Sequence, residues 1–301
     1  MPYLTGTPTT TASTDLRPGL GIPGLAHPLL APAEWAELTR PGAPVHWAVL
    51  NVADGPGTQP DPHCLEAAGR LRNAGVRVLG HLDASRLDTS RLDTARFDTA
   101  RFDTTRFDTA RAGAARSRAT GPRATGSGGP GRGPSRGGGG RSLGDLMSEA
   151  QRYVDWYRVD GFYLDRCPIE RADLPETRRA VGTLRALRDK AHIVLGHGTH
   201  PHPGYAECGD QLVTFSGPWS EYRWSQVAEW TADYPPGRFC HLVHGVPRGH
   251  LDEAMRIARW QGAATVWFTD RTDRGGRTDP WEAMPGYWDD IVSRIGTGVS
   301  E

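Results

Sequence analysis

Eight residues with polar side chains each stand at the end of a short apolar run. They are His27, Asn51, Asp83, Asp165, His197, Ser216, His244 and Asp270. Carboxylates and imidazoles transfer protons, and amides and hydroxyl groups hydrogen-bond polar substrates. Because the eight residues share one position relative to an apolar run, we expect the fold to gather them in one place.

The apolar runs predict eight buried strands. They are Ile22–His27, Trp47–Asn51, Val76–Asp83, Gly161–Asp165, Ile193–His197, Gln211–Ser216, Phe239–His244 and Thr265–Asp270. Each run is too short for a helix and too continuously apolar for a strand with one face in water, which is typical of parallel strands covered on both sides. Helix-like stretches follow most of the runs. The sequence therefore predicts an α/β fold, a single-domain (β/α)₈ TIM barrel, with its active site where the strands end.

Capping residues and apolar spacing mark the helices between the runs. Asp61 followed by a proline begins one of them, and Ser142 with Asp145 resembles a capping pair for another. The expected helices are His63–Asn73, Leu143–Tyr157, Leu174–Lys190, Leu251–Gln261 and Trp281–Ile295. Pro285 must bend or delay the last helix.

A low-complexity insertion at 85–141 interrupts the pattern after the third strand. Five copies of Arg-(Leu/Phe)-Asp-Thr-x begin at Arg86, Arg91, Arg96, Arg101 and Arg106, and a tail rich in Gly, Arg and Pro follows. A five-residue period gathers the apolar side chains on neither one helix face nor one strand face, and the tail has little to bury. We expect the insertion and residues 1–18 to be disordered, and the barrel to span 19–298. A folded pentapeptide solenoid is the alternative, although five units complete barely one coil.

Composition excludes several classes of protein. The 35 Lys and Arg residues balance the 35 Asp and Glu residues, so no net field favours nucleic acid or an anionic membrane. The four cysteines are scattered, which indicates neither a zinc knuckle nor a disulfide framework. No stretch is long enough to span a membrane, and the N-terminus lacks the features of a signal peptide. We expect a monomer that is cytoplasmic as the sequence stands, or secreted if the start site is mis-called.

The most specific local motif surrounds Asp165. A helix-like segment ends, an Asp-Gly turn follows at Asp160-Gly161, and the apolar run Phe162–Leu164 leads directly to Asp165. A carboxylate at the C-terminal end of a barrel strand can act as an acid, a base or a nucleophile in glycoside hydrolysis. The alternative is an ion pair with Arg166 that holds the carboxylate in a purely structural role.

The order of motifs resembles spherulation-specific family 4, across about residues 20–295 without the insertion. The matching segments are Asn51 with Gly55-Pro56-Gly57, Gly75-Val76-x-Val78-Leu79-Gly80-x-Leu82-Asp83, Trp156-Tyr157-x-Val159-Asp160-Gly161, Gly198-Thr199 with Pro203-x-Tyr205, Asp210-x-x-Val213-Thr214-Phe215, Leu242-Val243-His244, Thr269-Asp270, Pro280-Trp281 and Pro285-x-Tyr287-Trp288. The resemblance implies a glycoside-hydrolase-like TIM barrel. It also implies an amino-sugar polysaccharide as ligand, because characterised fungal relatives cleave galactosaminogalactan.

Three positions depart from the family pattern. Arg166 stands where the family usually has Glu, Ser216 replaces the Glu of Phe-Glu-Gly, and Gly196-His197-Gly198 replaces Asn-Pro-Gly. Asp165 is thus the one catalytic acid that the resemblance carries over. Glycoside hydrolysis in its common form needs two carboxyl groups. The candidates for the second carboxyl group are Asp83, Asp270 and Glu221.

We expect the remaining polar and aromatic candidates to bind the sugar. They are Asn51, His81, Arg166, His197, Ser216, Trp219, His244, Trp267, Trp281 and Tyr287, with Trp224 as a further wall of the cleft. Histidines at a polar barrel mouth bind hydroxyl groups or transfer protons. We expect no metal and no other cofactor, since the His-x-His motif of barrel metallohydrolases is absent from the first run.

Three functions follow from these residues. The first is binding, with hydrolysis at Asp165, of an amino-sugar polysaccharide resembling galactosaminogalactan. The second is a catalytically degenerate barrel that only binds carbohydrate, because Arg166 and Ser216 replace the usual acids. The third is a metal-dependent TIM-barrel hydrolase that uses His and Asp ligands from several strand ends. Fold alone does not choose among them.

Overall fold

Eight parallel strands close into a barrel in this chain. The structure is a computed structural model that describes residues 18–85, 87–88, 141–275 and 278–296. The strands follow one another around the barrel in the order β1-β10-β9-β8-β7-β6-β3-β2. Their bounds are β1 Gly19–Ile22, β2 Val45–Leu50, β3 Arg77–Asp83, β6 Gly161–Asp165, β7 His192–Gly196, β8 Gln211–Pro218, β9 Phe239–His244 and β10 Thr265–Phe268. The predicted TIM barrel is therefore confirmed.

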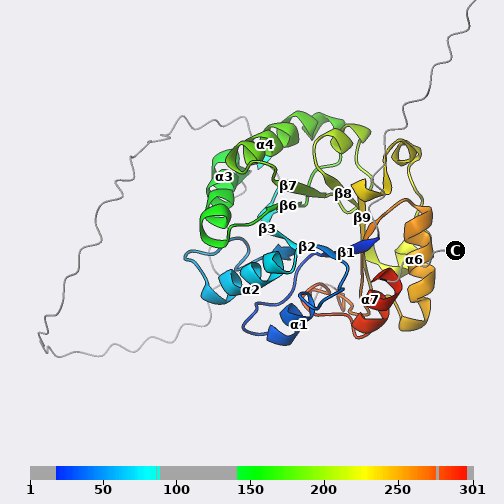
Figure 1. The fold of residues 1–301 in the computed structure, drawn as a ribbon. Coiled ribbons are helices and arrows are strands. Elements are labelled where there is room, and N and C mark those ends of the chain that lie inside the picture. The colour runs from blue at the N-terminus through cyan, green and yellow to red at the C-terminus, as the bar shows by residue number, and fades with distance from the viewer. Residues whose placement is uncertain (1–17, 86, 89–140, 276–277, 297–301) are drawn as a thin grey trace, which may run out of the picture. The chain divides into compact units, whose positions relative to one another are not determined.

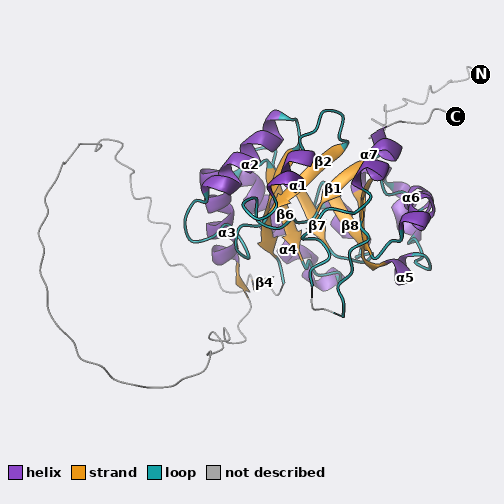
Figure 2. Cartoon of the chain, turned by 90° about the horizontal axis from the view of Figure 1, so that it is seen from below, coloured by secondary structure: helices purple, strands orange, loops and turns teal. Residues whose placement is uncertain are grey.

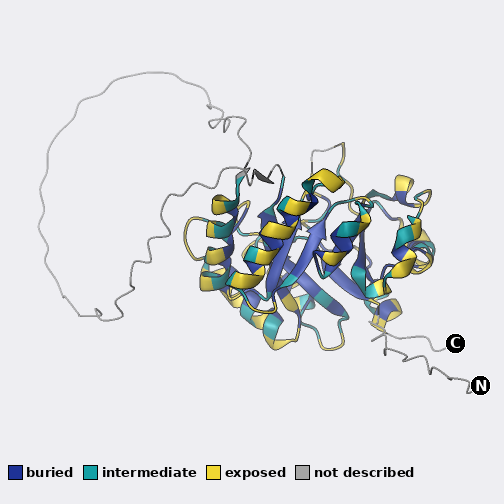
Figure 3. Ribbon diagram, turned by 90° about the horizontal axis from the view of Figure 1, so that it is seen from above, coloured by how far each residue is buried: buried dark blue, intermediate teal, exposed yellow. Residues whose placement is uncertain are grey.

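Helices surround these strands (Figure 1). The α-helices are α1 Pro32–Glu37, α2 Pro62–Asn73, α3 Leu143–Arg152, α4 Leu174–Leu187, α5 Trp219–Tyr222, α6 Leu251–Trp260 and α7 Trp288–Gly296. A π-helix, η1 Tyr153–Tyr157, continues α3, and 3-10 turns lie at η2 Arg171–Asp173, η3 Pro203–Glu207, η4 Glu229–Asp233, η5 Pro236–Arg238 and η6 Arg248–His250. The strands lie between the helices (Figure 2), and the strands are buried while the helices expose their outer faces (Figure 3). Such two-sided cover explains the continuously apolar runs.

The expected capping residues begin two of the helices. The side chain of Asp61 accepts a hydrogen bond from the Cys64 amide at the start of α2, and Ser142 accepts one from Asp145 at the start of α3. The last helix begins only at Trp288, because Pro285 delays it. Among the residues that the structure describes, no helix is both long and apolar enough to cross a membrane.

The first strand lies earlier in the chain than we expected. The sequence placed it at Ile22–His27, whereas β1 spans Gly19–Ile22 and pairs with β10 and β2. Pro23 follows directly and cannot donate a ladder hydrogen bond. His27 consequently lies in the loop after β1 and not at the end of a strand.

Two glycines on β1 make room for large side chains inside the barrel. A Cβ atom at Gly19 would overlap the ring of His46, and one at Gly21 would overlap the indole of Trp47. Trp47 is fully buried, and its Nε1 donates to Gln211 Oε1 on β8 at 2.7 Å. Since β2 and β8 are not neighbours, this hydrogen bond crosses the interior and shows that the barrel is filled.

A short parallel clasp lies at the two ends of the insertion. Strand β4 (Leu87–Asp88) pairs with β5 (Arg141–Ser142), with Leu87 opposite Arg141 and Asp88 opposite Ser142. The chain therefore returns beside the point from which it departs. The predicted disorder of 1–18 and of 85–141 otherwise concerns residues outside the described part of the chain.

Candidate active site at the barrel mouth

A cavity of about 340 Å³ lies at the C-terminal ends of the strands. The strand residues that line it are His81 on β3, Tyr163 and Asp165 on β6, Ser216 on β8 and Leu242 on β9. Residues of the loops that follow β1, β2 and β10 complete the lining. Its volume is at the lower end of the range for small-molecule sites, which is about 300–1,000 Å³. The position is the one that barrel enzymes use for their active sites.

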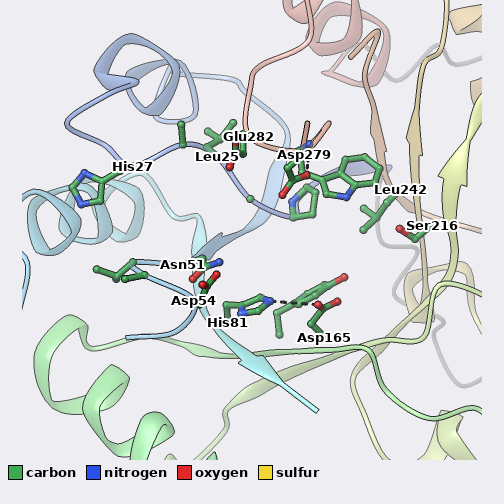
Figure 4. A pocket seen from close by; sticks show the side chains of 17 residues that line it. Leu25, His27, Asn51, Asp54, His81, Asp165, Ser216, Leu242, Asp279 and Glu282 are labelled. Carbon is green, nitrogen blue, oxygen red and sulfur yellow. Dashed lines mark hydrogen bonds and ion pairs between the residues drawn. The ribbon is translucent and has the colours of Figure 1, made fainter. Parts of the chain in front are cut away.

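Strands β3 and β6 place His81 next to Asp165 in this cavity. Asp165 is two residues after Tyr163 on β6, so both side chains face the same way. His81 Nε2 is 3.6 Å from Asp165 Oδ2 (Figure 4). The His81 ring stacks on Tyr163 at 6.3 Å between ring centroids and 17° between planes. Burial and the nearby Asp165 carboxylate raise the pKa of Tyr163, so its phenol stays protonated and can donate.

Arg166 joins Asp165 to a second carboxylate. Its Nη2 is 2.5 Å from Asp83 Oδ2, and its Nε is 3.6 Å from Asp165 Oδ2. Asp83 also accepts a hydrogen bond from the Ser85 amide at 2.8 Å and lies outside the cavity lining. Arg166 has φ +55°, a left-handed conformation that turns the chain sharply after β6. Asp83 is therefore held in an ion pair beside the site and is a poor candidate for the second acid.

Three cavity carboxylates were missed by the sequence analysis. Asp54 is in the loop after β2, and Asp279 and Glu282 are in the loop after β10. In Figure 4, Asp279 and Glu282 lie on the opposite side of the cavity from His81 and Asp165. Loop carboxylates follow no apolar run, so no periodic pattern marks them. For Asp54 the sequence did offer one signal, the turn that begins at Asn51. Asn51 Oδ1 accepts a hydrogen bond from the Gly55 amide at 2.9 Å, which shapes the loop that carries Asp54.

Trp281 is the aromatic wall of the cavity. Its amide donates to Asp279 Oδ1 at 2.9 Å, and its ring meets His244 edge-on at 5.6 Å between centroids. His244 is 9% exposed and lies behind Trp281, and its Nδ1 has no hydrogen-bond partner among the described residues. Burial lowers the pKa of His244 despite the opposing effect of nearby acids, so the ring is neutral at pH 7.

Three expected wall residues are buried elsewhere, which corrects the sequence analysis. Trp219 is 6% exposed and packs on Tyr222, and Trp267 is fully buried against Trp288. Tyr287 is 4% exposed, and its hydroxyl donates to the Val246 carbonyl at 2.9 Å. Trp224 is exposed but outside the cavity lining. Aromatic side chains near strand ends fill the space between strands and helices here, which their large apolar area favours.

Other expected site residues are distributed unevenly. Ser216 and Asn51 line the cavity, as we expected. His197 instead points to the Pro168 carbonyl, 2.9 Å from Nδ1, and burial lowers its pKa to about 4. Asp270 accepts from the Gly286 amide at 2.9 Å, and Glu221 is exposed in the first turn of α5. Neither of these acids lines the cavity formed by the described residues.

One cluster has the donor atoms for a metal ion. In the part of the chain that the structure describes, only His27, Asp61 and Cys64 bring three ligand atoms within 4.8 Å of one another. The strand-end histidines and aspartates that a metallohydrolase would need are not grouped in this way. A catalytic metal at the strand ends therefore finds no support in the geometry.

Sequence comparison identifies the family. A family model described as spherulation-specific family 4 matches residues 22–295. The chain belongs to this family. No curated protein matches the sequence significantly.

Solved structures of low sequence identity were compared with this spherulation-specific family 4 chain, and one of them shares its fold. Sph3 of Aspergillus clavatus, solved in complex with GalNAc, matches with a TM-score of 0.65 and 16% identity over 93% of this chain and 98% of that chain. A chitinase of Chromobacterium violaceum matches with a TM-score of 0.38 and 10% identity, over 75% and 67% of the two chains. A β-mannanase of Thermomonospora fusca has a TM-score of 0.31 and 13% identity, over 93% and 77%. The match to Sph3 shows the TIM-barrel fold.

Proposed function

We propose that the cavity at the barrel mouth binds an amino-sugar-containing polysaccharide and that Asp165 takes part in cleaving its glycosidic bond. The observation that carries the proposal is that Asp165 shares the cavity with carboxylates on the facing loops. A sugar between them would meet acids on both sides, as glycoside hydrolysis requires. The GalNAc bound to Sph3, whose fold this chain shares, supports the choice of an amino sugar.

The cavity offers three partners for Asp165. Asp54, Asp279 and Glu282 replace the earlier candidates Asp83, Asp270 and Glu221, which are outside the cavity. One carboxyl group would protonate the leaving oxygen while the other attacks the sugar or activates water. Trp281 would stack on the apolar face of a sugar ring, and Asn51, His81 and Ser216 would hydrogen-bond its hydroxyl groups.

Hydrolysis of acetylated and deacetylated galactosaminogalactan by the purified protein tests this function. We expect Asp165→Asn to lower kcat by about 10²–10⁴, the range for loss of a catalytic acid or base, with substrate binding retained. Single Asp54→Asn, Asp279→Asn and Glu282→Gln variants would identify the second acid. Asp270→Asn is the matched control outside the cavity and should retain activity. Equal product from the native protein and Asp165→Asn would remove Asp165 from the mechanism.

The Arg166 ion pairs favour a second function, carbohydrate binding without turnover. Arg166 stands where the family usually has Glu. Its guanidinium group forms an ion pair with Asp83 and lies 3.6 Å from Asp165. This hypothesis expects saturable oligosaccharide binding in calorimetry and no released sugar. It also expects the double variant Arg166→Glu, Ser216→Glu to gain activity. Hydrolysis by the unaltered protein that Asp165→Asn abolishes would reject it.

A further inference from the structure

Three potential metal ligands meet beside the cavity, at the junction of the loop after β1 and the start of α2. His27 Nε2 is 3.3 Å from Cys64 Sγ and 3.4 Å from Asp61 Oδ1. His27 lines the cavity, whereas Cys64 is fully buried behind it. The catalytic proposal uses none of these three side chains.

The spacing of these atoms fits a tetrahedral zinc ion. Zinc binds Cys sulfur at about 2.3 Å and His nitrogen or carboxylate oxygen at about 2.0–2.2 Å, so ligand atoms around it are roughly 3.3–3.6 Å apart. The two distances from His27 Nε2 already have this size, and all three ligand atoms lie within 4.8 Å of one another. Little rearrangement is therefore needed to close the three ligands around an ion.

The chemistry of the ligands also suits zinc. A thiolate, an imidazole and a carboxylate are its usual protein ligands. Asp61 Oδ1 accepts from the Cys64 amide at 2.9 Å, which orients the carboxylate and leaves a lone pair for a metal. The charges of Asp61 and of a Cys64 thiolate would together neutralise a divalent cation.

We propose that His27, Asp61 and Cys64 bind one zinc-type divalent cation that fastens the loop after β1 to the start of α2. The ion displaces the thiol proton of Cys64 into solvent, as metals do with coordinating thiols. The imidazole keeps one proton, which moves from Nε2 to Nδ1. In the metal-free protein Nδ1 accepts a hydrogen bond from the Leu29 amide at 3.2 Å. Once Nδ1 carries the proton, this hydrogen bond is lost and the exposed amide donates to water. A water molecule takes the fourth position.

Cobalt is the spectroscopic probe for this site. Tag-free, reduced, metal-free protein is titrated with Co²⁺, and we expect one equivalent to bind with a sulfur-to-cobalt charge-transfer band in the near ultraviolet. Added Zn²⁺ should bleach the band. Cys64→Ser should abolish it, whereas Cys208→Ser, which alters a buried free cysteine elsewhere, should retain it. Failure of Co²⁺ to bind stoichiometrically, or a band that survives Cys64→Ser, would overturn the proposal.

Two milder variants keep the test valid if Cys64→Ser fails to fold. Asp61→Asn keeps an N-cap acceptor for α2 but removes the charged ligand. His27→Ala removes a side chain that is already partly exposed. With folding checked by circular dichroism, each should weaken Co²⁺ binding at least tenfold. Unchanged affinity in both variants would contradict the site. Because sugar binding and hydrolysis are not measured here, the outcome is independent of the proposed function.

Discussion

Asp165 illustrates how one side chain acquires its surroundings from neighbouring strands. His81 comes from β3 and Tyr163 from the same strand as Asp165, so strand pairing alone brings the three together. Arg166 follows immediately, and its left-handed backbone directs its guanidinium group to Asp83 as well as to Asp165. The local surroundings of Asp165 are thus fixed by strand register, whereas its opposing acids depend on loops.

Trp281 provides a residue-level test of the proposed sugar site. We expect Trp281→Ala to raise the Kd for an oligosaccharide about tenfold, equivalent to about 1.4 kcal/mol, because the ring lines the cavity. Trp224→Ala is the matched control, since that tryptophan is 74% exposed and outside the cavity lining. Isothermal titration calorimetry measures both. A larger loss for Trp224→Ala would place the binding surface elsewhere.

The site was only partly predictable from the sequence at this scale. Asp165, Asn51 and Ser216 were placed well because each ends or follows a buried run, and strand ends meet at one mouth. The sequence analysis did not find Asp54, Asp279 and Glu282, because hydrophobic periodicity does not indicate the path of a loop. Trp267 was misplaced because an aromatic residue near a strand end fits the core and the cleft equally well.

Among the elements, β1 shows why strand bounds are harder to predict than strand number. Two of its four residues are Gly19 and Gly21, and their lack of side chains leaves space for His46 and Trp47 on β2. Glycine lowers strand propensity, so the sequence favoured the following run. By contrast β6 and β9 match their expected bounds.

A matched pair of glycine substitutions tests this role of β1. Gly21→Ala should lower the free energy of unfolding by about 1–3 kcal/mol, because its Cβ would overlap the Trp47 ring. Gly69→Ala, in the interior of α2 with no atom within 4 Å of the added Cβ, should raise it by about 0.5–1 kcal/mol. Urea denaturation measures both. Equal effects would mean that β1 tolerates side chains on its inner face.

For the whole molecule, the buried histidines make stability depend on pH. Burial, assisted by nearby His200, lowers the pKa of His241 to about 3, and its ring nitrogens contact Tyr222 and Thr214. The unfolded chain binds a proton near pH 6.5, whereas the folded chain does so only near pH 3. The contribution to stability is therefore complete above pH 6.5 and is lost as the pH falls toward 3.

His241→Gln should reduce this dependence. Glutamine keeps a donor and an acceptor for the two partners but does not titrate. Between pH 6.5 and 5 the native protein should lose about 1.5 kcal/mol more stability than the variant. Urea denaturation at the two pH values measures the difference, and the other buried histidines contribute equally to both proteins. Parallel losses would show that His241 is protonated in the folded chain.

The β4–β5 clasp has a consequence for how this chain can evolve. Because Leu87 pairs with Arg141, the two ends of the intervening segment are attached to the barrel in a way that does not depend on how long the segment is. Lengthening a closed loop adds little entropic cost, about 0.6 kcal/mol for each doubling. Gain or loss of repeat copies through slippage in the gene can therefore proceed without forcing β3 and β6 apart. The point of attachment to the barrel would stay the same whatever the number of repeats.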